Sequence, residues 1–134
     1  MIHEALQPAG WAQPKGYSNG VVASGRQVYL AGQVGWDGDC NFVSDVFAEQ
    51  VRQALANVVA LLAEAGAGPE HLVRLTWFIT SRDEYHDQIK DVGQAYREVI
   101  GRHFPPMSVV QVTALMEQRA KVEIEATAVI PDSG

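Results

Sequence analysis

The chain is poor in the features that mark secreted, membrane-spanning or nucleic-acid-binding proteins. Its 134 residues include one cysteine, Cys40, so no disulfide can form within the chain. No apolar run approaches the roughly 20 residues of a membrane-spanning helix. The first residues, MIHEALQPAGW, have neither a basic start nor the apolar core of a signal peptide. These absences predict a cytoplasmic protein with no membrane partner.

Basic residues are also few. Ten lysines and arginines stand against sixteen acidic residues, which gives a net charge of -6, and no three basic residues follow one another. Because phosphate binding normally requires a basic patch, we do not expect nucleic acid as a partner. The four histidines lack the spacing of metal ligands, so no metal site is expected either.

Hydrophobic residues make up 47% and charged residues 19% of the chain, a composition typical of a folded globular protein. The length suits one domain with a sizeable core, and neither a repeat nor an internal linker interrupts it. We expect a single domain over residues 1–134, well ordered over about 14–130, with loosely structured ends at about 1–14 and 131–134.

The first part of the chain predicts strands joined by tight turns. Two β-rich runs, SNGVVAS (18–24) and QVYLAG (27–32), flank Gly25-Arg26, where glycine suits a hairpin turn. A third short strand is expected at 33–36, closed by the turn residues DGDC. Cys40 ends this turn, and we expect its thiol to be exposed or half-buried.

A first helix is expected over residues 45–65. Ser44 or Asp45 can cap its start, and Gly66 supplies a stop signal. Its apolar residues recur at the spacing that places them along one face: Val51, Leu55, Val58 and Leu62.

A second helix is expected over residues 83–102. Ser81 and Glu84 form a capping box at its start, and Pro105 and Pro106 forbid its continuation. The residues expected on its buried face are Ile89, Val92, Tyr96 and Val99.

Three more strands complete the pattern, at 73–80, 107–113 and 121–130. The order is therefore β-β-β-α-β-α-β-β. This order predicts an α+β fold whose sheet carries two helices on one face.

The other face of that sheet needs a partner. Side chains alternate along a strand, so in KVEIEATAV one set of residues lies under the helices and the other set on the open face. The open face is expected to present Glu123, Glu125 and Thr127 with Tyr29, Thr76, Phe78, Val109 and Gln111. This mixture is too apolar for a wetted surface and too polar for a dry core. It favours a homo-oligomer, the alternative being a monomer with one solvated sheet face.

Four segments carry a resemblance to a known family. They are Gly16-Tyr17-Ser18, Ala31-Gly32-Gln33, Gln50-Val51 with Leu55-Ala56-Asn57-Val58, and Val122-Glu123-Ile124-Glu125-Ala126. In this order and spacing, the chain from about residue 14 to 130 is similar to the reactive-intermediate deaminase family, Rid or RidA, also called YjgF or endoribonuclease L-PSP. Where this chain has Ala31, the family usually has serine.

The resemblance implies a homotrimer of chorismate-mutase-like subunits, with three ligand clefts at the subunit interfaces. Well-known members hydrolyse short-lived imines, tautomers of enamines such as 2-aminoacrylate, to a ketoacid and ammonia, with no cofactor. In those members an arginine after the proline of the penultimate strand binds the substrate carboxylate. The matching residue here is Met107.

Two departures from the family pattern fall in this one cleft. Arginine presents a rigid fork of donors to a carboxylate, whereas Met107 presents none. The loss of such a charge-assisted hydrogen bond costs about 1.5–3 kcal/mol. Gly93 stands where the deaminases often have asparagine. We therefore expect a less acidic or bulkier substrate than 2-aminoacrylate, or a substitute clamp such as Arg74 or Arg119.

The resemblance also assigns the remaining site residues. Glu123 matches the glutamate that positions or activates the attacking water, and one carboxyl group can both deprotonate water and protonate the imine nitrogen. Gly32 lines the cleft with bare backbone, and Tyr17 covers it from the N-terminal segment. Val109 joins Met107 and Gly93 among the expected ligand-binding residues.

Other interpretations stand beside these. Met107 could plug a gap at a strand end, and Glu123 could be an ion-paired carboxylate at an interface. The same cleft could also sense or buffer a small metabolite without chemistry. The family's older name suggests a ribonuclease, but the negative net charge argues against that activity.

Overall fold

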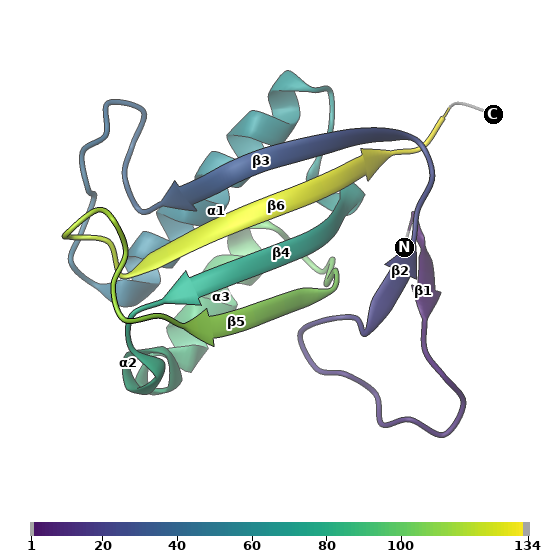
Figure 1. Ribbon diagram of the computed structural model, residues 1–134, viewed down its shortest axis with the longest axis horizontal. Coiled ribbons are helices and arrows are strands. Elements are labelled where there is room, and N and C mark those ends of the chain that lie inside the picture. The colour runs from purple at the N-terminus through teal and green to yellow at the C-terminus, as the bar shows by residue number, and fades with distance from the viewer. Residues whose placement is uncertain (1, 133–134) are drawn as a thin grey trace.

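The computed structural model describes residues 2–132 as one sheet with helices on one face and a small hairpin at its side (Figure 1). The main sheet has the order β3-β6-β4-β5, and a separate two-stranded sheet pairs β1 with β2. The strands are β1 (Glu4–Leu6), β2 (Gly20–Val22), β3 (Arg26–Val34), β4 (Leu72–Ile79), β5 (Met107–Gln111) and β6 (Val122–Ile130). The helices are α1 (Phe47–Glu64), the short 3-10 helix η1 (Pro69–His71), α2 (Arg82–Asp87) and α3 (Ile89–Val99).

The connections explain this strand order. β4 and β5 are parallel, and the chain passes from one to the other through α2 and α3, which pack behind the sheet with α1 (Figure 1). β6 then returns between β3 and β4 and is antiparallel to both. The α+β fold with helices on one face is therefore confirmed.

The apolar stripe of α1 forms the centre of the core. Val51, Leu55, Val58 and Leu62 have no exposed surface, as their helical spacing predicts. Beneath them lie Leu72, Leu75 and Ile124, which come from β4 and β6. The helix ends before Gly66, whose φ of 74° suits glycine at that position.

Three expectations for the first part of the chain are wrong. β2 pairs with β1 rather than with β3, so Gly25-Arg26 does not form a hairpin turn, and the segment before residue 14 contains a strand. No separate strand covers 33–36: residues 33 and 34 end the nine-residue β3, which passes through a bulge between Leu30 and Gln33, and Trp36 forms an isolated bridge with Phe42. Gly25 is still needed, because its φ is 144° and a β-carbon would collide with the backbone of Ile130.

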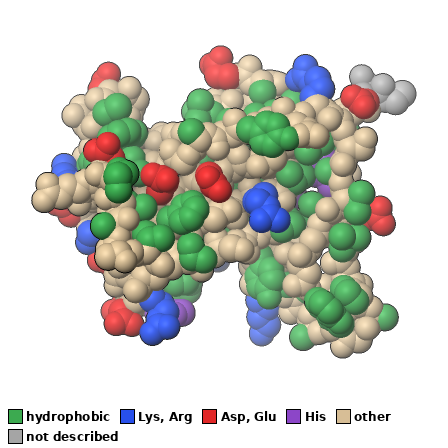
Figure 2. Space-filling view, in the orientation of Figure 1, with side chains coloured by type: hydrophobic (Ala, Val, Ile, Leu, Met, Phe, Trp, Pro, Cys, Tyr) green, Lys and Arg blue, Asp and Glu red, His purple; other side chains and the backbone are tan. Residues whose placement is uncertain are grey.

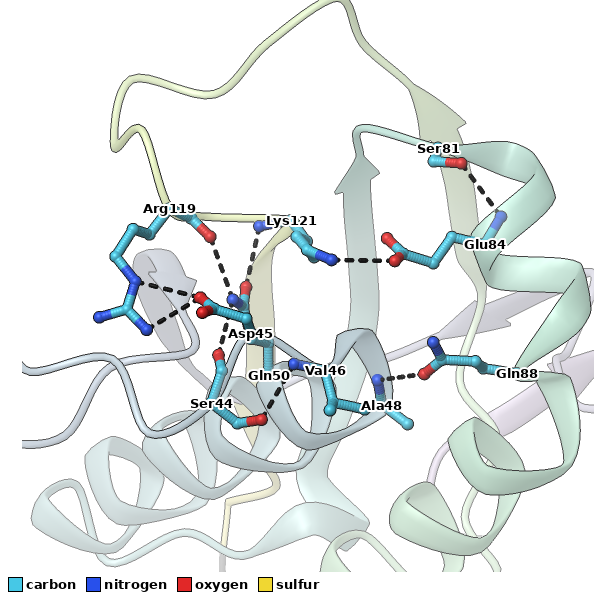
Figure 3. A network of polar contacts seen from close by, with 10 residues as sticks. All are labelled: Ser44, Asp45, Val46, Ala48, Gln50, Ser81, Glu84, Gln88, Arg119 and Lys121. Atoms are coloured by element: carbon cyan, nitrogen blue, oxygen red, sulfur yellow. Dashed lines mark hydrogen bonds and ion pairs between the residues drawn. The ribbon is translucent and has the colours of Figure 1, made fainter.

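The predicted second helix is broken into α2 and α3 at Gln88. The Gln88 side chain accepts a hydrogen bond from the backbone nitrogen of Ala48, 2.9 Å away in the first turn of α1 (Figure 3). Neither Ser44 nor Asp45 is the cap of α1, because that position is Val46 and has no side-chain cap. At α2 the Ser81 hydroxyl accepts from the backbone of Glu84, as predicted, while the Glu84 carboxylate pairs with Lys121 at 2.9 Å.

A fully buried amide ties this end of the core together. The Gln50 side chain donates to the carbonyl oxygens of Ser44 and Arg119, each at 3.0 Å, and accepts from the backbone nitrogen of Lys121 at 2.8 Å (Figure 3). The network thus joins α1, the loop before it and the start of β6. Because the Gln50 amide is fully buried, its donors and acceptor need partners within the protein, and these three backbone groups provide them.

We expect Gln50→Leu to lower the free energy of unfolding by about 2–4 kcal/mol, since it removes three hydrogen bonds that join α1 to its neighbouring segments and leaves three backbone groups without their partner. Gln53→Leu is the matched control, because Gln53 is only half-buried and its amide donates a single hydrogen bond, to Oδ1 of Asn57 on the same helix. Urea titration of both variants measures the difference. Equal loss in the two variants would contradict the role assigned to Gln50.

Three aromatic side chains line the sheet side of α3. Tyr96 stacks between Trp77 and Phe104, with ring centroids 6.5 Å and 5.4 Å away. Its hydroxyl donates to the carbonyl oxygen of His103 at 2.6 Å. Burial raises the pKa of the Tyr96 hydroxyl well above its usual value of 10.0, because the charged phenolate would be poorly solvated there.

This shift predicts a loss of stability at alkaline pH. Above about pH 10 the phenol ionises in the unfolded chain but stays protonated in the folded one, so unfolding releases a proton and rising pH favours it. We expect Tyr96→Phe to cost about 0.5–1.5 kcal/mol at pH 7 through the lost hydrogen bond. It should also flatten the decline above pH 10, measured by urea unfolding across pH. Parallel pH profiles for the two proteins would contradict this assignment.

Candidate functional site

The pairing of β4, β5 and β6 decides which residues share a face. Trp77 lies beside Ile124 on β6 and Val109 on β5, and this row faces the helices. Phe78 lies beside Glu123 and Val110, and this row faces away from them. The prediction that Val109 belongs to the open face is therefore wrong, as it is for Gln111, which is paired with the buried Ile79.

The open face carries the predicted mixture of side chains. Acidic, basic and apolar groups lie interspersed over the four strands when the sheet is seen from this side (Figure 2). The residues with side chains on this face include Tyr29, Arg74, Thr76, Phe78, Glu123, Glu125 and Thr127. Tyr29, on the edge strand β3, is 71% exposed, a large value for an aromatic residue on a sheet face.

Glu123 packs against Gly32 on the open face. A β-carbon built at Gly32 would stand 2.5 Å from Oε2 of Glu123 and 2.7 Å from its Cγ. No real β-carbon fits that space, so glycine is required for the carboxylate to lie where it does. The bulge in β3 brings this glycine to the carboxylate. Two residues that are far apart in the sequence thus lie in contact.

A pocket of about 620 Å³ opens on the helix side of the sheet, along the edge strand β5. Its walls come from β4, β5, α2, α3 and the segment before β2. The lining residues are Lys15, Gly16, Tyr17, Trp77, Tyr85, Ile89, Val92, Gly93, Tyr96, Arg97, Phe104, Met107 and Val109. Its volume lies within the range of small-molecule sites.

Four of the predicted ligand-binding residues meet in this pocket: Tyr17, Gly93, Met107 and Val109. Ile89, predicted to be buried in the core, is 44% exposed and lines the same space. Gly32 and Glu123 are absent from the lining and lie on the opposite face of the sheet. Within the chain, the six predicted residues therefore form two separate groups, four in the pocket and two on the open face.

Polar groups in the pocket are few. Among residues 2–132, the Nε1 atom of Trp77 is the one buried side-chain nitrogen or oxygen without a hydrogen-bond partner. Burial raises the pKa of the Tyr85 hydroxyl, which favours its neutral form. Arg97 and Lys15 are exposed residues of the lining and provide its positive charge. Sequence reasoning missed Arg97, although its i, i+4 relation to Gly93 was a usable signal.

A second cavity of the same volume lies at the loop between β5 and β6. The charged residues that line it are already engaged, since Arg119 pairs with Asp45 at 2.8 Å and Lys121 pairs with Glu84. These pairs join the loop to α1 and α2 (Figure 3). The cavity is thus better explained as part of the packing around Gln50.

The described part of the chain, residues 2–132, contains no group of three side chains placed to hold a metal ion. None of its helices is both long and apolar enough to cross a membrane. Cys40 is exposed, and its φ of 63° reflects the turn that the sequence predicted there.

Comparison with known proteins identifies the family. The family model Endoribonuclease L-PSP matches residues 9–130. The RutC family protein UK114 of Drosophila melanogaster is 30% identical over 96% of this chain and 90% of its own length. A human 2-iminobutanoate/2-iminopropanoate deaminase is 31% identical over 84% of this chain and 79% of its own.

Solved structures agree with this. A protein of unknown function of the Rid family, YyfB from Yersinia pestis, superposes with a TM-score of 0.83 at 30% identity, covering 97% of this chain and all of that one. Such agreement over nearly the full length establishes a common fold, and the family-model match establishes common descent. This chain belongs to the Rid family, also called YjgF or endoribonuclease L-PSP, whose named members include imine deaminases.

Proposed function

We propose that this protein hydrolyses an imine, or its enamine tautomer, to a carbonyl compound and ammonia in clefts shared between the protomers of a homotrimer. The observation that carries the proposal is the division of the predicted site between two faces of one sheet. Met107, Gly93 and Tyr17 line the pocket, while Glu123 lies against Gly32 on the open face. A carboxylate and a pocket so placed act together only when the open face of one protomer meets the pocket of the next.

The surface chemistry supports that assembly. Tyr29, Phe78 and Val110 place apolar groups on the open face beside carboxylates, and β5, with the pocket along it, is an edge of the sheet. Packing against a copy of the chain would cover this apolar surface and leave the polar groups at the interface hydrated. Packing against copies of the chain thus accounts for both the exposed aromatic groups and the divided site, and the trimer is the assembly that the family resemblance implies.

The reaction needs one group that handles protons. Water attacks the imine carbon while the Glu123 carboxylate accepts a proton from it, and the nitrogen takes up a proton to give a carbinolamine. The carbon–nitrogen bond then breaks, ammonia leaves, and the remaining hydroxyl loses its proton to form the carbonyl group. The sum is imine plus water to carbonyl compound plus ammonia, so no cofactor is required. Met107 in place of an arginine argues for a substrate other than 2-aminoacrylate.

A second function, metabolite binding without chemistry, has one observation in its favour. The lining of the pocket within the described protomer contains aromatic, aliphatic and basic side chains but no carboxylate, histidine or cysteine. If the open face of a neighbour did not bring Glu123 to it, this pocket would bind a ligand and leave it unaltered. The deaminase takes precedence because Glu123 and Gly32 fit each other so closely.

Replacement of Glu123 by Gln tests the reaction. We expect Glu123→Gln to lower the rate of ketoacid release from imines generated in solution by about 10²–10⁴-fold, because general acid–base catalysis contributes about that much. Glu125→Gln is the matched control, since Glu125 lies two residues along the same face of β6. It should retain most of the activity.

The assay is run on both variants at equal concentration, after their oligomeric state has been confirmed by light scattering. Undiminished turnover by Glu123→Gln would exclude the proposed role. A bound ligand recovered unchanged from the natural protein, with no turnover of any imine tested, would favour the binding function instead.

The assembly itself gives a further prediction. A chain of 14.6 kDa should behave in light scattering as a particle of three times that mass, roughly 44 kDa. Phe78→Glu places a charge at the centre of the open face and should yield monomers that retain their helical circular dichroism and lose turnover. Leu61→Glu, on the exposed side of α1, is the control and should stay trimeric. A natural protein that is monomeric at micromolar concentration would contradict the shared cleft.

A further inference from the structure

The pocket beside β5 has a chemistry that defines its ligand. Five of its lining residues are aromatic, namely Tyr17, Trp77, Tyr85, Tyr96 and Phe104, and four more have aliphatic side chains, namely Ile89, Val92, Met107 and Val109. Two are cations, Lys15 and Arg97, and the described lining contains no acid. In a chain with net charge -6, a pocket whose charged groups are all positive favours an anionic ligand.

Gly93 and Arg97 form a matched pair on α3. They are four residues apart, so their side chains lie on the same side of the helix. A β-carbon built at Gly93 would stand 3.2 Å from Nη1 of Arg97, closer than such atoms normally approach. The guanidinium group therefore lies over the bare backbone of Gly93, at the rim of the pocket. Any larger residue at 93 would take the space that the guanidinium group now uses.

Within one protomer, the other candidate arginines do not line this pocket. Arg119 is engaged with Asp45 and lines the cavity at the β5–β6 loop. Arg74 lies on the open face of the sheet, beside Thr127 on β6. Met107, at the position of the family's arginine, contributes an adaptable apolar wall to the pocket. Arg97 is thus the arginine that this protomer presents to a ligand in the pocket.

Trp77 contributes aromatic surface to the pocket wall. Its side chain is 3% exposed, and the Nε1 atom is enclosed by protein atoms. A ligand in the pocket therefore packs against the exposed part of this ring, which adds to its preference for an apolar or aromatic side chain.

We propose that the pocket binds 2-oxo acids, and the imines derived from them, that bear an aromatic or comparably bulky apolar side chain. Arg97, seated over Gly93, holds the carboxylate from the α3 wall, and Met107 and the aromatic residues enclose the side chain. Relative to the arginine of the family pattern, the anion clamp has moved from β5 to α3. For the imines, this assignment rests on the proposed deaminase function; for binding of the oxo acid, it rests on the pocket alone.

Calorimetric titration with phenylpyruvate, an aromatic 2-oxo acid that needs no catalysis, tests the assignment. The natural protein should bind phenylpyruvate at least about tenfold more tightly than pyruvate, because the aromatic ring buries apolar surface against the walls. Arg97→Met should weaken phenylpyruvate binding by about tenfold through loss of the charge-assisted pair. Arg82→Met, which removes an exposed arginine of α2 outside the lining, should bind as the natural protein does.

The Gly93→Asn variant distinguishes a role of Arg97 in ligand binding from a purely structural role in α3. Asparagine is at least as good a helix former as glycine, so the melting temperature should hold or rise. Its side chain competes with the guanidinium group for space, so phenylpyruvate affinity should fall several-fold. A variant that is more stable yet binds less tightly is not explained by a purely structural role for Arg97.

Equal affinity of Arg97→Met and Arg82→Met for phenylpyruvate overturns the proposal, as does a natural protein that binds pyruvate as tightly or binds neither acid. Failure of the deaminase function is seen separately. In that case Glu123→Gln and the natural protein show equal imine turnover while the dependence of phenylpyruvate binding on Arg97 persists.

Discussion

The two-residue period of the β-strand is the constraint on which the site depends. Along β6 the side chain of Ile124 is fully buried under α1, and so Glu123 and Glu125 must face the other way. The same alternation along β4 and β5 turns Trp77, Met107 and Val109 toward α3. A slip of one residue would exchange the two faces and bury the carboxylates, so the hydrophobic core enforces the register. The division of the site between two faces follows from this packing.

Polar side chains of the helices hold that packing in place by binding the backbone of other elements. Gln50 links α1 to the start of β6, Gln88 caps the first turn of α1 from α2–α3, and Asn57 donates to the carbonyl oxygens of Val34 and Trp36. Because these groups are satisfied internally, they are unavailable to a ligand. Arg97, by contrast, is not part of these contacts and lines the pocket.

Local rules predicted the parts of the fold whose signal lies within a few residues. The stripe of α1, the strands β4 and β6, and the Ser81 cap all belong to this class. The break at Gln88 could not be read this way, since no proline or glycine marks it and its side chain serves a distant helix. The sequence also did not determine which face of the sheet the side chain of Val109 lies on. In MSVVQ the neighbours Val109 and Val110 are both apolar, so the alternation of side chains does not show which of the two faces the core. The pairing of Val109 with the buried Trp77 on β4 decides this, because paired residues share a face.

The sequence by itself determined the family, the helix that covers the sheet, and the presence of Met107, Gly93 and Glu123 at the positions that the family resemblance assigns to the site. These depend on residue type and on order along the chain. Only the tertiary structure decided that Glu123 lies against Gly32, and that Arg97 occupies the space above Gly93 beside a wall of aromatic residues. Such contacts depend on strand register, a bulge and side-chain packing. Strand register, the bulge and side-chain packing depend on how segments that are far apart in sequence pack into one core. A local sequence pattern does not encode that packing.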